Sequence, residues 1–274
     1  MVVYQTDFGL KDGAVSEMKG VAMGVSPDLK LFDLTHEIPA YNIWEAANRL
    51  DQPVRSWPKG TVFVSVVDPG VGTSRKSVVL KTKSGHFIVT PDNGTLTLVG
   101  QSLGIEEVRE INEAVNRRKD SQKSYTFHGR DVYSYTGARL AAGVITFAQV
   151  GPVLPKIISI PYQHATLNGK TLKGDIPVLD VQYGNIWTNI PAGLFNQLKP
   201  KFGDIVHVVI FNKGKQVYQG NMPYSQTFGE VAEGKPLAYL NSLLQLSFAL
   251  NMGDFAKAHH IKSGADWSVE VSLK

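Results

Sequence analysis

Strand-like and helix-like segments alternate through the first half of this 274-residue chain. Short runs rich in β-branched and aromatic residues predict buried strands at residues 2–5, 30–34, 62–67, 77–81 and 87–90. Apolar residues at helical spacing predict helices at residues 14–25, 43–50 and 132–144. Such alternation is typical of a mainly parallel sheet flanked by helices, so we expect an N-terminal α/β domain at residues 1–150.

The sequence changes character after residue 150. Residues 151–164 contain several prolines and little helix-forming sequence, which predicts a linker. Beyond the linker, segments of alternating polarity end in short Gly and Asn turns, as at Ile205–Phe211 before Asn212-Lys213-Gly214. We therefore expect an α/β protein with a smaller, C-terminal antiparallel β domain at residues 165–274.

Composition argues against several classes of protein. The chain has no cysteine, which excludes disulfides, thiolate metal sites and a cysteine nucleophile. No signal-peptide pattern opens the chain and no run of about 18 apolar residues occurs, so we expect a cytoplasmic protein without a membrane partner. The net charge is +4, but the basic residues are scattered, and we interpret the densest cluster, Arg117-Arg118-Lys119, as a solvated face.

Polar or glycine-containing loops follow several of the predicted strands. Ligands of open α/β sheets bind outside the carboxyl ends of the strands, so these loops are candidates for chemistry. They are Thr6-Asp7-Phe8-Gly9 with Asp12, Thr35–Pro39, Val67–Thr73 with Arg75, Pro91-Asp92-Asn93-Gly94, and Thr126–Asp131. The pairing of Asp68 with Arg75 fits either a salt bridge in a turn or a catalytic pair.

Common cofactor motifs are incomplete in this sequence. Gly169-Lys170-Thr171 lacks the earlier glycine of a phosphate-binding loop, where His164 stands, and Gly70-Val71-Gly72 lacks the third glycine of the dinucleotide fingerprint. His36-Glu37 has no second histidine at zinc-protease spacing. We therefore expect neither a metal ion nor a cofactor.

Taken in order, the loops resemble those of the S-adenosyl-L-methionine (SAM) hydrolase family. These enzymes are also called SAM hydroxide adenosyltransferases, and they are related to fluorinase and chlorinase. The resemblance continues at Asp180–Ile190 and from Asn241-Ser242 to Asn251, so it covers nearly the whole chain. It implies attack of water at the ribose C5′ of SAM, which yields adenosine and L-methionine. Because methionine leaves as a neutral thioether, the protein needs only to orient and polarise one water molecule.

The resemblance implies a catalytic set of Asp68, Arg75 and His128. Asp68 can accept the proton from water, Arg75 can keep that carboxylate ionised, and His128 can orient or relay. The sequence leaves open whether Asp68 or His128 is the formal base. Arg130 and Asp131 are expected to be structural, with Asp131 capping the helix that follows.

The resemblance also implies contacts to each part of the substrate. Asp7 matches a carboxylate that binds the ribose diol, Asp12 and Asp180 lie near the methionine amino group, and Ser242 donates to the methionine carboxylate. Aromatic contacts are assigned to Tyr41, Phe127 and Tyr183. Contacts to adenine are assigned to Asn185, Asn251 and Met252. Leu243 and Leu250 stand where fluorinase has arginines, so contacts to the methionine end differ there.

Two positions favour hydrolysis over the SAM-dependent halogenation of the relatives. The halogenating enzymes have a tyrosine where this chain has Asp68, and fluorinase has a halide-holding serine where this chain has Gly129. An anionic Asp68 would repel fluoride or chloride beside the reacting carbon.

Motifs from both domains are required, so the resemblance implies a site between neighbouring subunits of a homotrimer, with SAM or adenosine as ligand. Two other classes of function stay open besides halogenation. A metal-dependent phosphoesterase would use Asp7, Asp68, Asp92 and His128. A nucleic-acid-binding module would fit the basic charge, although we expect no nucleic-acid partner.

Overall fold

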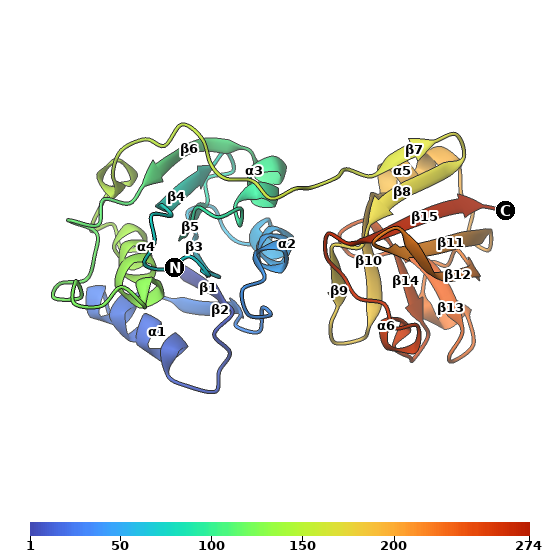
Figure 1. Cartoon of the computed structure of the whole chain (residues 1–274), viewed down its shortest axis with the longest axis horizontal. Helices are drawn as coiled ribbons and strands as arrows, with labels where there is room; N and C mark the ends of the chain where they lie inside the picture. Colours follow the sequence, from blue (N-terminus) through green and yellow to red (C-terminus); the bar gives the residue numbers. More distant parts are fainter. The chain divides into compact units, whose positions relative to one another are not determined.

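The computed structural model describes all residues from Met1 to Lys274 and divides the chain into two compact units, Met1–Ile160 and Pro161–Lys274 (Figure 1). The division lies within the expected linker at residues 151–164. Most of that segment packs on the first unit: Leu154 N donates to Val108 O, and Ile158 N donates to Asp92 Oδ1. The connection between the units therefore begins only after Ile160.

A six-stranded sheet in the order β2-β1-β3-β5-β4-β6 lies at the centre of the first unit. Its strands are β1 (Val2–Thr6), β2 (Leu31–Thr35), β3 (Val62–Val66), β4 (Ser77–Thr82), β5 (Phe87–Pro91) and β6 (Ile105–Glu110). Strands β1, β2, β3 and β5 are parallel, and β4 is antiparallel to both of its neighbours. The mainly parallel sheet is confirmed. The sequence pattern missed β6 because this edge strand, Ile-Glu-Glu-Val-Arg-Glu, buries little apolar surface.

Helices cover both faces of this sheet (Figure 1). On one face, α1 (Ala14–Val25) and α4 (Tyr135–Ala141) pack against the strands through Met18 and Ala138. On the other face, α2 (Ile43–Val54) and α3 (Thr97–Leu103) contribute Leu50 and Val99. A 3-10 turn, η2, spans Phe147–Val150.

The segment before α4 differs from the expected helix at residues 132–144. A π-helix, η1 (Gly129–Ser134), precedes α4, so the helical segment begins earlier than its apolar pattern indicates. Asp131 lies in the first turn of η1 and its carboxylate pairs with Arg130 Nε at 2.8 Å. The expectation that Asp131 caps the helix was wrong, because the chain turns helical before this residue.

The second unit consists of two antiparallel sheets, in the orders β12-β11-β15-β8-β7 and β13-β14-β10-β9. The strands are β7 (Thr166–Asn168), β8 (Thr171–Asp175), β9 (Val178–Asp180), β10 (Asn185–Pro191), β11 (Ile205–Asn212), β12 (Lys215–Pro223), β13 (Pro236–Leu240), β14 (Gln245–Leu250) and β15 (Trp267–Leu273). Short helical turns are α5 (Ala192–Phe195), η3 (Asn196–Leu198), η4 (Phe228–Glu230) and α6 (Phe255–Ala258). The antiparallel β architecture expected for this half is confirmed.

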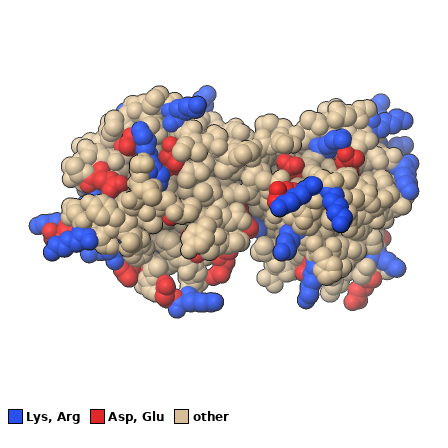
Figure 2. Space-filling view, viewed as in Figure 1, with Lys and Arg blue, Asp and Glu red and all other residues tan.

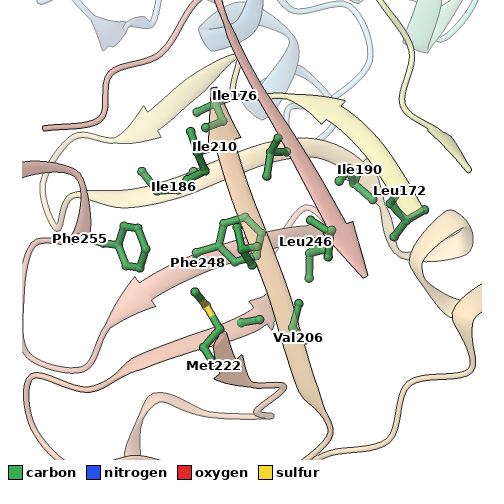
Figure 3. Packing of buried hydrophobic residues seen from close by; sticks show 14 of the residues in the cluster. Leu172, Ile176, Ile186, Ile190, Val206, Ile210, Met222, Leu246, Phe248 and Phe255 are labelled. Atoms are coloured by element: carbon green, nitrogen blue, oxygen red, sulfur yellow. The ribbon is translucent and has the colours of Figure 1, made fainter. Parts of the chain in front are cut away.

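Apolar side chains from both sheets form one core in the second unit (Figure 3). Ile186 of β10 and Phe248 of β14 pack in the same cluster as Val206 and Ile210 of β11. The buried positions of β11 alternate with more exposed ones, which is the pattern of a strand with one face on the core.

No helix of either unit combines the length and apolar character needed to cross a membrane. On the face drawn in Figure 2, basic and acidic side chains occur on both units rather than in one uniformly basic area.

Candidate active site

The candidate site begins where β1 and β3 end. These two strands are parallel neighbours, with Thr6 paired to Val66, so the residues that follow them emerge at the same edge of the sheet. Asp7 follows β1, and Asp68 follows β3 after Val67. His128 comes from a distant part of the chain and immediately precedes η1. This arrangement agrees with the expectation that loops at strand ends are brought together.

A cavity of about 290 Å³ lies at this edge of the first unit. It is lined by Asp7, Phe8, Ala40, Tyr41, Val66, Asp68, Val71, Thr126, Phe127, His128 and Gly129. The structure thus brings together five of the sequence-predicted site residues. Asp7 Oδ2 accepts a hydrogen bond from Tyr41 N at 2.8 Å, which fixes the loop after β2 on the loop after β1.

Asp68 and Arg75 form a two-pronged ion pair beside the cavity. Arg75 Nε donates to Asp68 Oδ1 at 2.8 Å, and Arg75 Nη2 donates to Asp68 Oδ2. Both side chains are nearly removed from solvent, at 5% exposure for Asp68 and 9% for Arg75. Burial lowers the pKa of Arg75, but its hydrogen bond and charge interaction with Asp68 raise it by more, so the guanidinium stays charged.

Two hydroxyl groups complete the surroundings of this pair. Tyr133 Oη donates to Asp68 Oδ2 at 3.2 Å, and Ser77 Oγ accepts from Arg75 Nη1 at 2.9 Å. Burial raises the pKa of Tyr133 well above its usual value, and the neighbouring Asp68 charge adds to this effect. Tyr133 therefore remains a protonated donor to Asp68 at all ordinary pH values.

His128 contacts a guanidinium with each of its ring nitrogens. Nδ1 lies 2.9 Å from Arg75 Nη2, and Nε2 lies 3.3 Å from Arg117 Nη1. Burial lowers the pKa of His128, and the charges of Arg75 and Arg117 lower it further, against an opposing effect of Glu113. His128 is therefore neutral at pH 7, and the shorter contact identifies Nδ1 as the acceptor from Arg75.

The interpretation of Arg117-Arg118-Lys119 as a solvated face was wrong for its first member. Arg117 is buried and pairs with Glu113 at 2.8 Å, whereas the Arg118 side chain is 45% exposed. Sequence reasoning missed Glu113, Arg117 and Tyr133 as neighbours of the site. The spacing of four residues between Glu113 and Arg117 was the available signal for their pairing.

The remaining predicted residues of the second unit line a larger cavity, of about 890 Å³. These residues are Asp180, Tyr183, Asn185, Ser242, Asn251 and Met252. Asn185 Nδ2 donates to Asp180 Oδ2 at 3.2 Å, which orients both side chains. The buried Nδ2 of Asn241, another lining residue, has no partner within the chain. An unpartnered buried donor in a cavity wall favours a polar ligand.

Asp12 and Asp92 lie apart from these cavity walls. Asp12 is exposed and accepts from Ala14 N at 3.0 Å at the beginning of α1, so its contact to the methionine amino group stays a prediction. Asp92 Oδ1 accepts a hydrogen bond from Ile158 N at 2.9 Å, near the end of the first unit. No group of three or more His, Asp and Glu side chains is close enough together to bind a metal ion, so the four residues proposed for a phosphoesterase do not assemble into a metal site.

Comparison with known proteins agrees with this geometry. Residues 2–151 match the SAM hydroxide adenosyltransferase N-terminal domain, and residues 174–268 match the C-terminal domain of the same family. A crystal structure of an uncharacterized conserved protein from Thermotoga maritima is similar to this chain with a TM-score of 0.91 and 34% identity, covering 99% of this chain and 100% of that one.

Relatives with assigned activities include two reaction types. An (R)-S-adenosyl-L-methionine hydrolase of Methanocaldococcus jannaschii is 36% identical over 78% of this chain and 74% of its own. A hydrolase of the same name from Thermus thermophilus is 32% identical over 96% of each chain. A fluorinase of Actinopolyspora mzabensis is 28% identical over 96% of this chain and 95% of its own. Since both domain matches together span most of its length, the chain belongs to the SAM hydroxide adenosyltransferase family.

Proposed function

We propose that this protein hydrolyses S-adenosyl-L-methionine to adenosine and L-methionine. The main support is the buried, arginine-paired carboxylate of Asp68, which lines a cavity together with Asp7 and His128. The similarity to proteins named (R)-S-adenosyl-L-methionine hydrolase supports the same reaction. From that name, we propose the R epimer at sulfur as the preferred substrate.

The reaction is a single displacement at the ribose C5′. A bond forms between the water oxygen and C5′ as the C5′–S bond breaks, and the bonding electron pair stays on sulfur. The positively charged sulfonium becomes the neutral thioether of methionine, so the leaving group requires no proton. The water gives up one proton, which Asp68 accepts and later releases to solvent.

We assign Asp68 Oδ1 as the atom that accepts this proton. A carboxylate offers about four lone-pair sites. Oδ2 receives hydrogen bonds from Arg75 Nη2 and Tyr133 Oη, whereas Oδ1 receives only the one from Arg75 Nε. Oδ1 thus keeps a lone pair for the water molecule, while Nδ1 of His128 is engaged with Arg75. This difference favours Asp68 over His128 as the base.

Substrate contacts in the first unit follow from the cavity wall. Asp7 Oδ1 has no hydrogen-bond partner within the chain and is available for a ribose hydroxyl, because only Oδ2 is engaged by Tyr41 N. Tyr41 and Phe127 offer ring surfaces in the same cavity. We assign these three residues to binding rather than to the chemical step.

Substrate contacts in the second unit are assigned by residue type. The side-chain amide of Asn185 suits the donor and acceptor edge of adenine, and the backbone at Asn251 and Met252 adds to that edge. Asp180 suits the methionine ammonium group and Ser242 its carboxylate. Their shared cavity of about 890 Å³ is within the usual range for small-molecule sites.

The geometry around Gly129 favours hydrolysis over halogenation. A Cβ atom at this position would lie 3.3 Å from the ring of Phe8 and 3.4 Å from the ring of Phe127. A serine there, which the resemblance associates with halide binding, would be tightly packed. The anionic Asp68 beside the same cavity opposes the approach of a halide ion.

We also propose that the active form is a homotrimer, as the resemblance implies. Mass determination at working concentration, combined with activity across a dilution series, tests this assembly. Undiminished specific activity in a proven monomer would contradict it.

Product analysis tests the reaction itself. Purified protein is incubated with the R and S epimers of SAM, with and without chelator, and with added chloride or fluoride, before chromatography. We expect adenosine and methionine in equal amounts, preferentially from the R epimer, and no loss in chelator. Faster formation of a 5′-halogenated nucleoside would favour halogenation, and activity restored to chelated protein by a divalent ion would favour metal-dependent chemistry.

A further inference from the structure

The imidazole of His128 lies between two guanidinium groups. Its Nδ1 is 2.9 Å from Arg75 Nη2 and its Nε2 is 3.3 Å from Arg117 Nη1, and the residue is only 4% exposed. A neutral imidazole accepts one hydrogen bond, whereas an imidazolium accepts none. Protonation would therefore remove the acceptor for Arg75 and place a third positive charge between two others.

Each of the three guanidinium nitrogens of Arg117 donates a hydrogen bond that holds the side chain in this position. Nη1 donates to Glu113 Oε2 at 2.8 Å, Nη2 donates to Ser124 O at 2.8 Å, and Nε donates to Ser121 Oγ at 3.1 Å. Its carbon Cζ lies 4.7 Å from the centre of the Tyr125 ring. The side chain is 3% exposed, so its charge acts on His128 with little screening by water.

The other groups that face His128 are themselves paired. Asp68 is bound by Arg75, and Glu113 is bound by Arg117. The rings of Tyr125 and Tyr133 lie 6.2 and 6.5 Å from the imidazole, centre to centre. Because each nearby carboxylate is matched by a guanidinium, Glu113 and Asp68 raise the pKa of His128 by less than burial and the two arginines lower it.

The contact between His128 and Arg75 bears directly on the proposed base. Arg75 Nη2 carries two hydrogens, one directed to Asp68 Oδ2 and the other to His128 Nδ1. A neutral His128 thus fixes the plane of the guanidinium that orients Asp68. The contacts form a continuous path from Glu113 through Arg117, His128 and Arg75 to Asp68.

We propose that Arg117, held by Glu113, is a positioning residue that keeps His128 as a neutral acceptor for Arg75 and thereby maintains the orientation of Asp68. The inference rests on the proposed function, in which Asp68 takes the proton from water. It assigns His128 the part of a fixed acceptor rather than that of a base, and it gives Arg117 a place in the reaction although Arg117 touches no reacting atom.

Nitrogen-15 NMR of labelled histidine rings tests the proposal without any need for turnover. The His128 signal is assigned by its loss in His128→Asn. In the parent protein, we expect a neutral ring protonated at Nε2 at pH 7, titrating below the usual value of 6.5. Arg117→Gln should raise the titration midpoint by about one to three pH units, because it removes one facing positive charge.

Two charge changes of opposite sign separate this effect from general damage to the fold. Glu113→Gln removes a negative charge and should lower the His128 midpoint, the reverse of Arg117→Gln. Arg117→Lys keeps the charge and should restore a midpoint near that of the parent. Arg118→Gln, a change at the exposed neighbour, serves as the matched control and should leave the midpoint unchanged.

Turnover measured across pH completes the test. The acid limb of kcat for Arg117→Gln should move upward by the same interval as the His128 midpoint, with KM within about threefold of the parent value. An unchanged His128 midpoint in folded Arg117→Gln, or shifts of the same sign in Arg117→Gln and Glu113→Gln, would overturn the proposal. Absence of SAM hydrolysis in the parent with the expected NMR shifts would instead contradict only the proposed function.

Discussion

Arg75 donates hydrogen bonds to both carboxylate oxygens of Asp68, from Nε to Oδ1 at 2.8 Å and from Nη2 to Oδ2. The pair fixes the carboxylate plane as well as its position, because the two bonds of a planar guanidinium are parallel. Of the carboxylate oxygens of Asp68, only Oδ1 then keeps a lone pair that can bind a water molecule, the one that does not face Arg75. The direction of that lone pair is set by Arg75, so the identity of this residue should matter beyond its charge.

Arg75→Lys tests the need for a two-pronged contact. Lysine keeps the positive charge but cannot donate in parallel to both oxygens, so the carboxylate loses its fixed orientation. We expect kcat to fall by about 10- to 100-fold, since small errors in orientation are costly in displacement reactions. Arg118→Lys, at an exposed site, is the control in steady-state kinetics. Equal activity of Arg75→Lys and the parent would show that charge alone suffices.

Tyr133→Phe removes the third hydrogen bond to Asp68. Tyr133 Oη donates to Oδ2 at 3.2 Å and accepts from Ser77 Oγ at 3.2 Å. A hydrogen bond to a charged group is worth about 1.5–3 kcal/mol, so kcat should fall by about tenfold or more. Steady-state rates and thermal unfolding are measured together. A loss of stability with unchanged kcat would limit Tyr133 to a structural role.

Gly129→Ser tests the steric argument against halogenation. The added Cβ would lie 3.3 Å from the Phe8 ring, and overpacking of this kind costs about 1–3 kcal/mol of unfolding free energy. We expect a lower melting temperature and no 5′-halogenated nucleoside in chloride or fluoride. Gly20→Ser is the matched control, because a Cβ at Gly20 in α1 meets no atom within 4 Å. Halogenated product from Gly129→Ser would show that this one position decides the reaction.

The depressed pKa of His128 predicts a specific dependence of stability on pH. Because the unfolded chain binds a proton near pH 6.5 and the folded chain only at lower pH, the unfolding free energy contributed by this residue falls as pH drops through 6.5. The loss continues until the pH reaches the pKa of the folded state. Denaturant unfolding of the parent and of His128→Gln, compared from pH 8 to 5.5, isolates this contribution.

The difference in unfolding free energy between the parent protein and His128→Gln should shrink or change sign as the pH is lowered. His259, whose pKa is also lowered by burial and by His260, is present in both proteins and cancels in the comparison. A difference that stays constant with pH would mean that His128 titrates alike in the folded and unfolded chain.

The sequence was sufficient to predict the buried strands of the first unit and the loops that follow them, but not the edge strand β6. Runs such as Val62–Val66 are apolar and β-branched throughout, as buried parallel strands require. The position of Asp68 beside Arg75 and His128 was expected from the ordered resemblance rather than from any local pattern, since a lone histidine before a helix has many structural uses. In the structure, Arg75 contacts both Asp68 and His128 and so joins the three side chains.

The sequence could not predict the hydrogen-bond partners of the site that depend on long-range packing. In the sequence, Tyr133 resembles one more apolar residue of a helix, and only the packing of η1 against β3 and β5 places its hydroxyl on Asp68. Arg117 is the first residue of the basic triplet Arg117-Arg118-Lys119, and nothing in this triplet indicates that Arg117 is buried. Its burial follows from the turn at residues 113–124, which folds serine carbonyls around the guanidinium.

Hydrolysis in oxygen-18 water tests the central claim most directly, by mass spectrometry of the products from SAM with the parent protein and with Asp68→Asn. We predict one labelled oxygen in adenosine, none in methionine, and a loss of turnover of about 10²- to 10⁴-fold in Asp68→Asn with adenosine binding retained. Unlabelled adenosine, or a turnover of Asp68→Asn equal to that of the parent protein, would contradict attack at C5′ by a water molecule that Asp68 activates.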